Sequence, residues 1–361
     1  MAMGRRGSGI LKASLSALHF SGVDSLLRPL TRGTGAVFML HHVLPATRLP
    51  FAPNRHLEVT PEFLDRVIRL VIARGFDIVS LDQARGRLRE GELDHPFVCF
   101  TFDDGYRDTL HHAYPIFKRH GLPFAVYVAS DFADGRGDLW WLALEQLLRG
   151  VDAIELKIAG DMKRFSCRWP SEKMRAYRAI YGWLQQLPEI DARGIVADLC
   201  RARELDVSGL CRELVMDWDE LRDLARDPLV TIGAHSRRHL PLSQLSFADS
   251  RFEIEQSIAR IEREIGRPCR HFSFPCRDDG GAGAREFGLA SEAGIATAVT
   301  AQSGLLRPDH GLTLAALPRL ALNGELQKPR YVKVMLSGAP FALRKLAGRF
   351  NPRGAPADAT A

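Results

Sequence analysis

The chain has 361 residues, of which 46% are hydrophobic and 25% are charged, and its net charge is +6. This composition is that of a globular protein and excludes a disordered or fibrous chain. No basic patch is interleaved with aromatic residues, so nucleic acid is not an expected partner. The six cysteines form no C-x-x-C pair, which favours a reducing compartment.

Residues 1–34 are expected to form an amphipathic helical segment. Apolar side chains recur there at roughly helical spacing, at Ile10, Leu11, Leu15, Leu18, Leu26 and Leu27. Lys12 and His19 interrupt the apolar part and no A-x-A site follows, so a signal peptide is not expected. No run of about 18 apolar residues exists that would predict a membrane-spanning helix.

Basic residues gather near both ends of the chain, among them Arg5, Arg6, Arg344 and Lys345. Solubilising tails are one interpretation of these residues, and contact with an anionic membrane is the other. We therefore expect a cytoplasmic protein, either free or peripheral to the inner membrane.

Strand-like and helix-like segments alternate over residues 35–325. The expected strands are 36–43, 76–81, 97–102, 123–128, 229–235, 270–275 and 295–300. The clearest helices are expected at 60–75, 247–266 and 284–293. Such alternation predicts an α/β sheet or barrel of parallel strands with the helices outside.

Two segments depart from this alternation. Residues 139–227 carry helical patterns without clear strands, which indicates a helical insertion. Residues 326–361 form a basic C-terminal segment that ends in a flexible tail rich in Ala, Pro and Gly.

Functional residues of α/β folds gather at the C-terminal ends of the strands. The first predicted strand ends at His41 and His42, and the third ends at Asp103 and Asp104. The strand at 229–235 runs into the sequence GAHSRRH, which contains His235 and His239. All these side chains are therefore expected at one end of the fold.

Two imidazoles and one carboxylate form a three-ligand metal site with an open position for water. His235 and His239 are four residues apart, a spacing that lets two side chains reach one ion on a helical turn. A divalent ion lowers the pKa of its water, and a second carboxylate can take the proton as the water attacks a carbonyl. The adjacent aspartates thus suggest one metal ligand and one general base.

The order of three motifs, TFDDG, HSRRH and RHFSFP, resembles that of the polysaccharide deacetylases, the NodB-homology carbohydrate esterases of family 4 type. The likeness covers roughly residues 35–325. It implies a distorted (β/α) barrel, with the helical insertion at about 139–227, and one divalent ion, Zn²⁺ first and Co²⁺ or Ni²⁺ as alternatives. It also implies an acetylated glycan as substrate, with removal of N-acetyl or O-acetyl groups and with chitooligosaccharide among the candidates.

The resemblance assigns the general base to Asp103 and the metal ligands to Asp104, His235 and His239. The stretch FMLHHV resembles a strand of the family that places His41 beside the site. The third motif implies substrate or oxyanion contacts from Phe274, Pro275, Cys276 and Arg277, with the backbone N–H of Cys276 stabilising the oxyanion.

The sequence departs from the family pattern in two places. The arginine that orients the base in the third motif is absent, and Arg270 or Arg277 is a candidate substitute. The late Leu-x-His motif, which supplies the general acid, is not evident near LPRLALNG at 317–324. His41 is therefore the first candidate for the acid and His310 the second.

Three further residues keep two interpretations each. Trp140 and Trp141 either stack on sugar rings or anchor the start of a helix. Arg319 forms either a structural salt bridge or a pair with an active-site carboxylate. The function keeps alternatives too: a metal-dependent deacetylase, a carbohydrate-binding pseudoenzyme with a degenerate site, or a metal phosphoesterase, which would favour a second metal.

Overall fold

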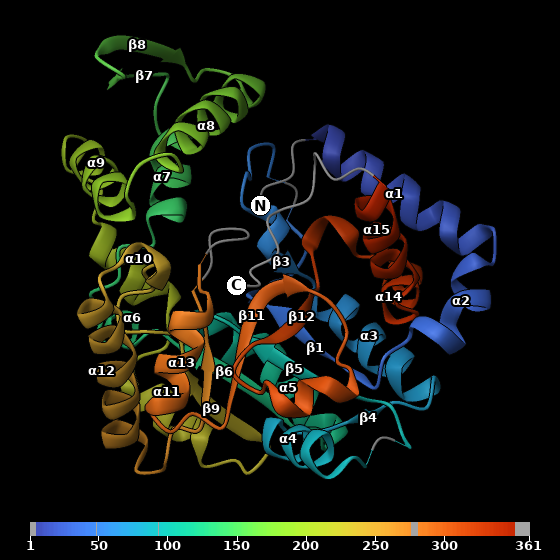
Figure 1. Cartoon of the computed structure of the whole chain (residues 1–361). Helices are drawn as coiled ribbons and strands as arrows, with labels where there is room; N and C mark the ends of the chain where they lie inside the picture. The colour runs from blue at the N-terminus through green and yellow to red at the C-terminus, as the bar shows by residue number, and fades with distance from the viewer. Residues whose placement is uncertain (1–4, 48, 93, 276–280, 351–361) are drawn as a thin grey trace.

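Parallel strands close into a barrel at the centre of the molecule (Figure 1). The computed structural model describes every residue except 1–4, 48, 93, 276–280 and 351–361. Around the barrel the strands follow the order β1-β12-β11-β10-β9-β6-β5, and β5 pairs again with β1. Their bounds are β1 Gly35–Leu40, β5 Phe97–Phe102, β6 Phe124–Val128, β9 Val230–Ala234, β10 His271–Ser273, β11 Thr297–Ser303 and β12 Leu317–Ala321. The expected (β/α) barrel is confirmed.

The interior of the barrel is a packed core. Because side chains alternate along a strand, Val37 of β1 and Cys99 of β5 point inward, where they join Tyr127 and Val299 in one buried cluster. Helix α4 (Leu81–Glu90) adds apolar side chains to this cluster. The short strand β4 (Asp77–Ile78) pairs with the first residues of β5, so α4 closes the end of the barrel at which the strands begin.

Helices surround the barrel and bury their apolar faces against the outward side chains of the strands. They are α3 Pro61–Ala73, α5 Tyr114–His120, α6 Ser130–Ala133, α11 Trp218–Ala225, α12 Phe247–Ile265 and α13 Ala284–Glu292, with the π-helical turn η2 at Thr109–Ala113 before α5. Thr60 caps α3, since its side chain accepts a hydrogen bond from the Phe63 N–H. The predicted helices at 60–75, 247–266 and 284–293 are confirmed.

The insertion stands on one side of the barrel end and has a hydrophobic core of its own (Figure 1). Its helices are α7 Trp140–Arg149, α8 Pro170–Leu184, α9 Glu189–Arg201 and α10 Val207–Leu214. The expectation that it contains no strands is wrong, because β7 (Ala153–Ile158) and β8 (Asp161–Ser166) form an antiparallel hairpin. In β7, buried Ile154, Leu156 and Ile158 alternate with polar residues, while β8 is almost entirely exposed and depends on its pairing with β7.

The two ends of the chain meet in a layer of helices on the opposite side of the barrel (Figure 1). These terminal helices are α1 Arg5–Phe20, α2 Val23–Thr31, α14 Pro329–Leu336 and α15 Ala339–Phe350. Gly22 adopts φ 73° between α1 and α2 and breaks the expected N-terminal helix in two. The predicted flexible tail after Phe350 lies outside the described residues. Within the described chain, no helix is both long and apolar enough to cross a bilayer.

Two strand predictions need correction. The strand expected at 36–43 divides into β1 and β2 (His42–Val43), which pairs with β3 (Glu58–Val59), so His41 lies between two strands. Strand β12 is absent from the predicted strands, because it contains Pro318, which cannot donate a ladder hydrogen bond. Pro318 lies where the pairing of β11 with β12 shifts register, and an irregularity of this kind accommodates a proline. The remaining elements are single 3₁₀ turns: η1 Arg55–Leu57, η3 Leu242–Gln244, η5 Pro308–Leu312 and η6 Gly324–Leu326.

Candidate active site

Most of the predicted site residues converge at the C-terminal end of the barrel. Asp103 and Asp104 follow β5, and His235 follows β9. The Asp103 N–H donates to the carbonyl of Leu40 (2.9 Å), which fixes the Asp-Asp turn to the end of β1. Together with His239 and His41, these residues line one cavity. The expectation that they share one end of the fold is therefore confirmed.

Asp104, His235 and His239 form a three-ligand cluster. One ligand atom from each lies within 4.8 Å of the others. The Oδ1 atom of Asp104 lies 3.2 Å from Nε2 of His239 and 3.5 Å from Nε2 of His235. A set of two imidazoles and one carboxylate is the ligand set of a catalytic divalent ion that keeps an open position.

The hydrogen bonding of this cluster fits a metal ion. Nδ1 of His235 lies 2.7 Å from the carbonyl oxygen of Ser273; since a carbonyl only accepts, Nδ1 carries the proton and Nε2 keeps its lone pair. The buried Oδ1 of Asp104 accepts no hydrogen bond from any described residue. Burial acts to raise the pKa of Asp104, but the imidazoles of His239 and His235 hold it well below its ordinary value. The carboxylate is thus ionised and available as a ligand.

The backbone of the site is held in a conformation that most residues avoid. Asp104, Ser236 and His239 have φ of 69°, 57° and 57°, in the left-handed region. The Ser236 hydroxyl accepts a hydrogen bond from the His239 N–H (3.0 Å) and stabilises this loop. Left-handed non-glycine residues cost free energy and concentrate where function fixes a side-chain direction, which is the situation of two of the three candidate ligands.

Asp103 is held by a buried arginine from β12. Arg319 reaches its carboxylate with two parallel hydrogen bonds, Nη1 to Oδ1 at 2.7 Å and Nη2 to Oδ2 at 2.8 Å. The same guanidinium donates to the Ser273 hydroxyl (3.0 Å) and to the Thr300 carbonyl (2.9 Å). Of the two interpretations of Arg319, the structure agrees with a pair to a carboxylate of the candidate site, Asp103. Burial acts to raise the pKa of Asp103, but the charge and hydrogen bonds of Arg319 act together with His235 and His41 to bring the pKa below its ordinary value.

Of the two arginines proposed from the sequence, Arg270 does not take this role. Arg270 precedes β10, at the far end of the barrel, where its guanidinium lies 3.7 Å from Asp82 of α4. The prediction that Arg270 orients the base is therefore wrong. Arg270 lies where strand β10 begins, whereas Asp103 lies at the end of the barrel where the strands finish. Arg277 lies outside the described residues.

Of the two candidate acids, only His41 lies at the site. It lines the cavity beside Asp103 and Asp104. Burial lowers its pKa, while the carboxylates of Asp104 and Asp103 act in the opposite direction. His310 lies in η5, which contacts α4 at the closed end of the barrel, so its candidacy as the acid is wrong. His42, the neighbour of His41, is buried; its Nδ1 lies 2.6 Å from Asp108 and its ring stacks on Tyr106.

The cavity above the site has a volume of about 350 Å³. The insertion forms one of its walls, with Trp140, Trp141, Tyr181, Gln185 and Glu189. Both tryptophans are almost fully buried, and Trp140 stacks on Tyr181 with ring centroids 5.2 Å apart. The tryptophans are therefore packing anchors that also contribute edges to the cavity, and Tyr181 is the more accessible ring.

The third motif is only partly described. Phe274 is buried against Phe272 and Phe287 and lines the cavity together with Pro275. The Phe274 N–H donates to the Val299 carbonyl (3.0 Å) and continues the barrel ladder past the end of β10. Cys276, the expected oxyanion donor, lies outside the described residues.

Two supporting residues were not found from the sequence. Glu253 of α12 is fully buried and accepts hydrogen bonds from the N–H groups of Arg237 (3.1 Å) and Arg238 (2.8 Å). Arg193 of α9 donates to the carbonyls of Arg238 (2.9 Å) and His239 (2.7 Å). These contacts clamp the loop that carries His239 from both sides. In the sequence, Arg193 with Glu189 has only the pattern of a surface ion pair four residues apart.

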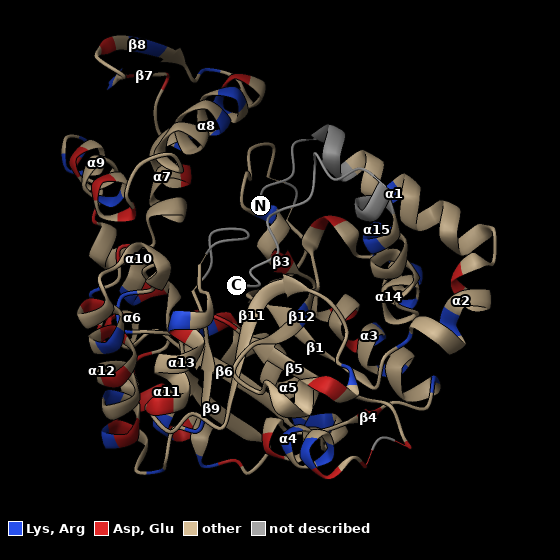
Figure 2. Ribbon diagram, in the orientation of Figure 1, with Lys and Arg blue, Asp and Glu red and all other residues tan. Residues whose placement is uncertain are grey.

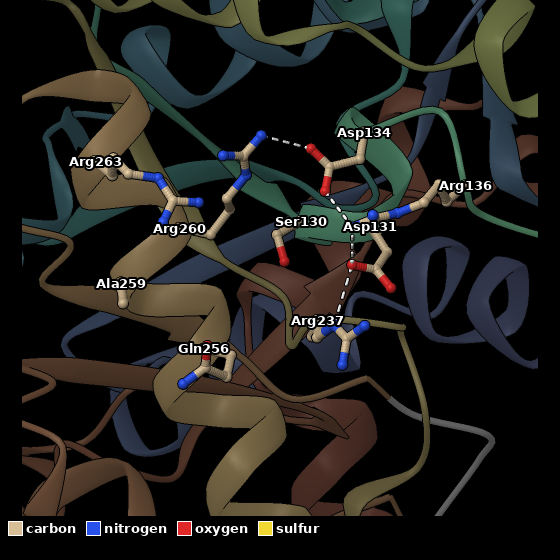
Figure 3. A pocket seen from close by; sticks show the side chains of 9 residues that line it. All are labelled: Ser130, Asp131, Asp134, Arg136, Arg237, Gln256, Ala259, Arg260 and Arg263. Atoms are coloured by element: carbon tan, nitrogen blue, oxygen red, sulfur yellow. Dashed lines mark hydrogen bonds and ion pairs between the residues drawn. The ribbon is translucent and has the colours of Figure 1, made fainter.

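A second hollow, of about 470 Å³, lies on the outer side of the same loop (Figure 3). Ion pairs cross it between Arg237 and Asp131 (3.2 Å), Arg136 and Asp131 (3.1 Å), and Arg260 and Asp134 (2.7 Å). None of the candidate site residues lines it. This network joins the loop to α6 and α12, so we interpret it as support for the catalytic end of the barrel.

Comparison with known proteins agrees with the geometry. Residues 90–282 match the family model described as polysaccharide deacetylase. No curated protein sequence matches significantly. Among solved structures, the Streptococcus pyogenes deacetylase PplD in complex with acetate superposes with a TM-score of 0.56 at 14% identity, covering 83% of this chain and 97% of that one.

Two further structures show the same fold. IcaB from Ammonifex degensii has a TM-score of 0.52 at 16% identity and covers 84% of this chain and 97% of its own. The putative polysaccharide deacetylase BA0330 from Bacillus anthracis has a TM-score of 0.51 at 11% identity, with 83% and 68% covered. At such identities these likenesses establish the fold alone. The family match spans more than half of the sequence, and the chain belongs to the polysaccharide deacetylase family.

Proposed function

We propose that this protein is a metal-dependent hydrolase that removes N-acetyl groups from an acetylated glycan. The observation that carries the proposal is the pairing of an open Asp104–His235–His239 cluster with a separate, ionised Asp103 in one cavity. An O-acetyl group is the alternative substrate bond, and chitooligosaccharide is one candidate glycan.

Zn²⁺ is the expected ion, because two imidazoles and a carboxylate suit it, with Co²⁺ and Ni²⁺ as alternatives. Bound there, a divalent ion would lower the pKa of a water molecule and polarise the acetyl carbonyl. The lone pair on Nε2 of His235 and the unpartnered Oδ1 of Asp104 support its binding at this place.

Asp103 acts as the general base in this proposal. Arg319 keeps its carboxylate ionised and in a fixed orientation. As the water oxygen bonds to the acetyl carbon, Asp103 takes the water proton. The C–N bond then breaks while the nitrogen receives a proton, which yields acetate and the free amine.

His41 is the proposed donor of that last proton. Burial favours its neutral form, so the proton that it delivers would be the one that Asp103 takes from the attacking water and then passes to His41. Its place beside both carboxylates supports this transfer. A role restricted to lining the cavity is the alternative for His41.

The direct test is acetate release from a panel of acetylated glycans, measured after chelation and after return of Zn²⁺ or Co²⁺. We expect activity to disappear on chelation and to return with the ion. His239→Ala should strongly lower both the metal content and the activity. A wild-type protein that holds the ion and binds the glycans without releasing acetate would instead establish the pseudoenzyme.

A further inference from the structure

The terminal helices α1, α2, α14 and α15 form a layer with a packed inner face. Leu15 of α1 is buried with Tyr331 and Val334 of α14. The Thr31 hydroxyl of α2 donates to the Ser337 carbonyl (2.6 Å), so both ends of the chain are tied together. These contacts hold the helices of the layer to one another, and Val332 and Leu336 of α14 pack into the core around the barrel, so the inner face of the layer is buried.

The outer face of the same layer is apolar. Ile10, Phe20, Leu26 and Leu30 are 67%, 74%, 78% and 84% exposed. The exposed positions of α1 whose side chains are described are all uncharged: Gly9, Ile10, Ala13, Ser14, Ala17 and Phe20. Helix α12, by contrast, exposes charged residues such as Glu255 and Glu262. Exposed Ile, Leu and Phe side chains that gather on helices in mutual contact, as α1 and α2 are, mark an interaction site.

The layer is also strongly basic. Its four helices contain nine Lys or Arg and a single acidic residue, Asp24, which is 1% exposed. Their charge of +8 exceeds the +6 of the whole chain, so the positive charge of the protein is concentrated here. Figure 2 shows α1 and α2 with almost no red along their length. Arg344 and Lys345 are exposed beside Leu343 and Leu346 of α15.

We propose that this face binds the surface of an anionic membrane, with the apolar side chains at the acyl boundary and the cations at the lipid headgroups. Amphipathic helices that combine exposed Leu and Phe with flanking Lys and Arg bind in this way. A second copy of the chain is a poorer occupant, because a symmetric dimer through this face would bring two strongly positive layers together.

The test is flotation of the full chain with phosphatidylcholine vesicles that contain or lack phosphatidylglycerol. We expect binding to the phosphatidylglycerol vesicles only, with a decrease as salt is added. Leu26→Ser with Leu30→Ser should reduce binding at least about tenfold. The matched control is Leu49→Ser with Leu312→Ser, two exposed leucines outside the layer, and it should bind as the wild type does.

Removal of charge gives the second arm. Arg344→Ser with Lys345→Ser should weaken binding roughly fivefold for each cation removed. Arg201→Ser with Arg226→Ser, whose side chains are 76% and 80% exposed elsewhere, should leave binding unchanged. Circular dichroism should be unaltered in all these variants, because every substituted side chain is at the surface.

Three results would overturn the proposal: no binding to either vesicle, equal binding to both, or a dimer in solution that Leu26→Ser with Leu30→Ser dissociates. The last would assign the face to a second copy. Acetate release from a soluble oligosaccharide should be the same in every variant, so the outcome is independent of the deacetylase proposal.

Discussion

The barrel end and the helical insertion contribute to one cavity in different ways. The barrel supplies buried ionisable groups, two of which have a dedicated partner: Asp103 with Arg319, and His235 with the Ser273 carbonyl. The insertion supplies Tyr181 and Gln185 at the cavity wall, and its Arg193 donates a hydrogen bond to the backbone of the loop that carries His239. From this difference in residue types we infer that, in the proposed function, the barrel would carry out the reaction and the insertion would select the glycan.

The largest expected effect is that of Asp103→Asn. Asparagine keeps an oxygen for Arg319 but cannot take a proton, so acetate release should decrease by at least about 10²-fold. Metal content and the circular dichroism spectrum should stay as in the wild type. A variant that keeps the ion and retains near-normal activity would remove Asp103 from the role of base.

Arg319→Gln should change the pH dependence as well as the rate. The guanidinium lowers the pKa of Asp103, and the base works only when ionised, that is, above its pKa. Without Arg319 the pKa of Asp103 rises, so the acid limb of kcat/KM should move to higher pH. Arg319→Lys, which keeps the charge, should move it less. An unchanged acid limb in both variants would show that another group titrates there.

His41→Gln distinguishes a proton donor from a cavity-lining residue. An amine must be protonated as it leaves, whereas an activated aryl acetate releases a leaving group that needs no proton. We therefore expect His41→Gln to slow amide hydrolysis about 10²-fold and aryl acetate hydrolysis far less. Equal losses on both substrates would point to a structural role.

Arg193→Ala tests whether the insertion supports the metal site. Loss of the hydrogen bonds to the carbonyls of Arg238 and His239 should weaken Zn²⁺ affinity about tenfold, the usual effect of removing an outer-shell contact. Competition with a chelator measures this affinity. Arg201→Ala, in the same helix with its side chain 76% exposed, is the control. Equal affinities in the two variants would mean that the barrel end holds the ion without help.

Tyr181→Ala should give the smallest effect. If the ring packs against the glycan, its loss should raise KM for an oligosaccharide roughly three- to tenfold and leave kcat unchanged. Trp169→Ala removes an exposed aromatic ring of the same insertion outside the cavity and should change neither constant. A decrease in kcat alone for Tyr181→Ala would contradict a role in binding.

The barrel and the cluster of candidate metal ligands could be predicted from local features of the sequence. Apolar runs such as 97–102 become buried strands, and parallel strands bring their C-terminal ends together, so Asp104 and His235 had to meet. The spacing of His235 and His239 and the adjacency of the aspartates are local properties that the sequence displays directly.

The side chains that complete the candidate site could not be predicted from the sequence, because they come from distant elements that pack together. Arg319 reaches Asp103 across 216 residues from a strand that its proline concealed, and Arg270, equally plausible in the sequence, emerges at the wrong end of the barrel. Arg193 could not be predicted either: its helix has the sequence pattern of a surface helix, yet Arg193 binds the backbone of the loop that carries His239. Packing between distant elements brings such partners together. The hydrophobic periodicity of a helix or strand indicates which of its faces is buried but does not identify the residues that this face contacts.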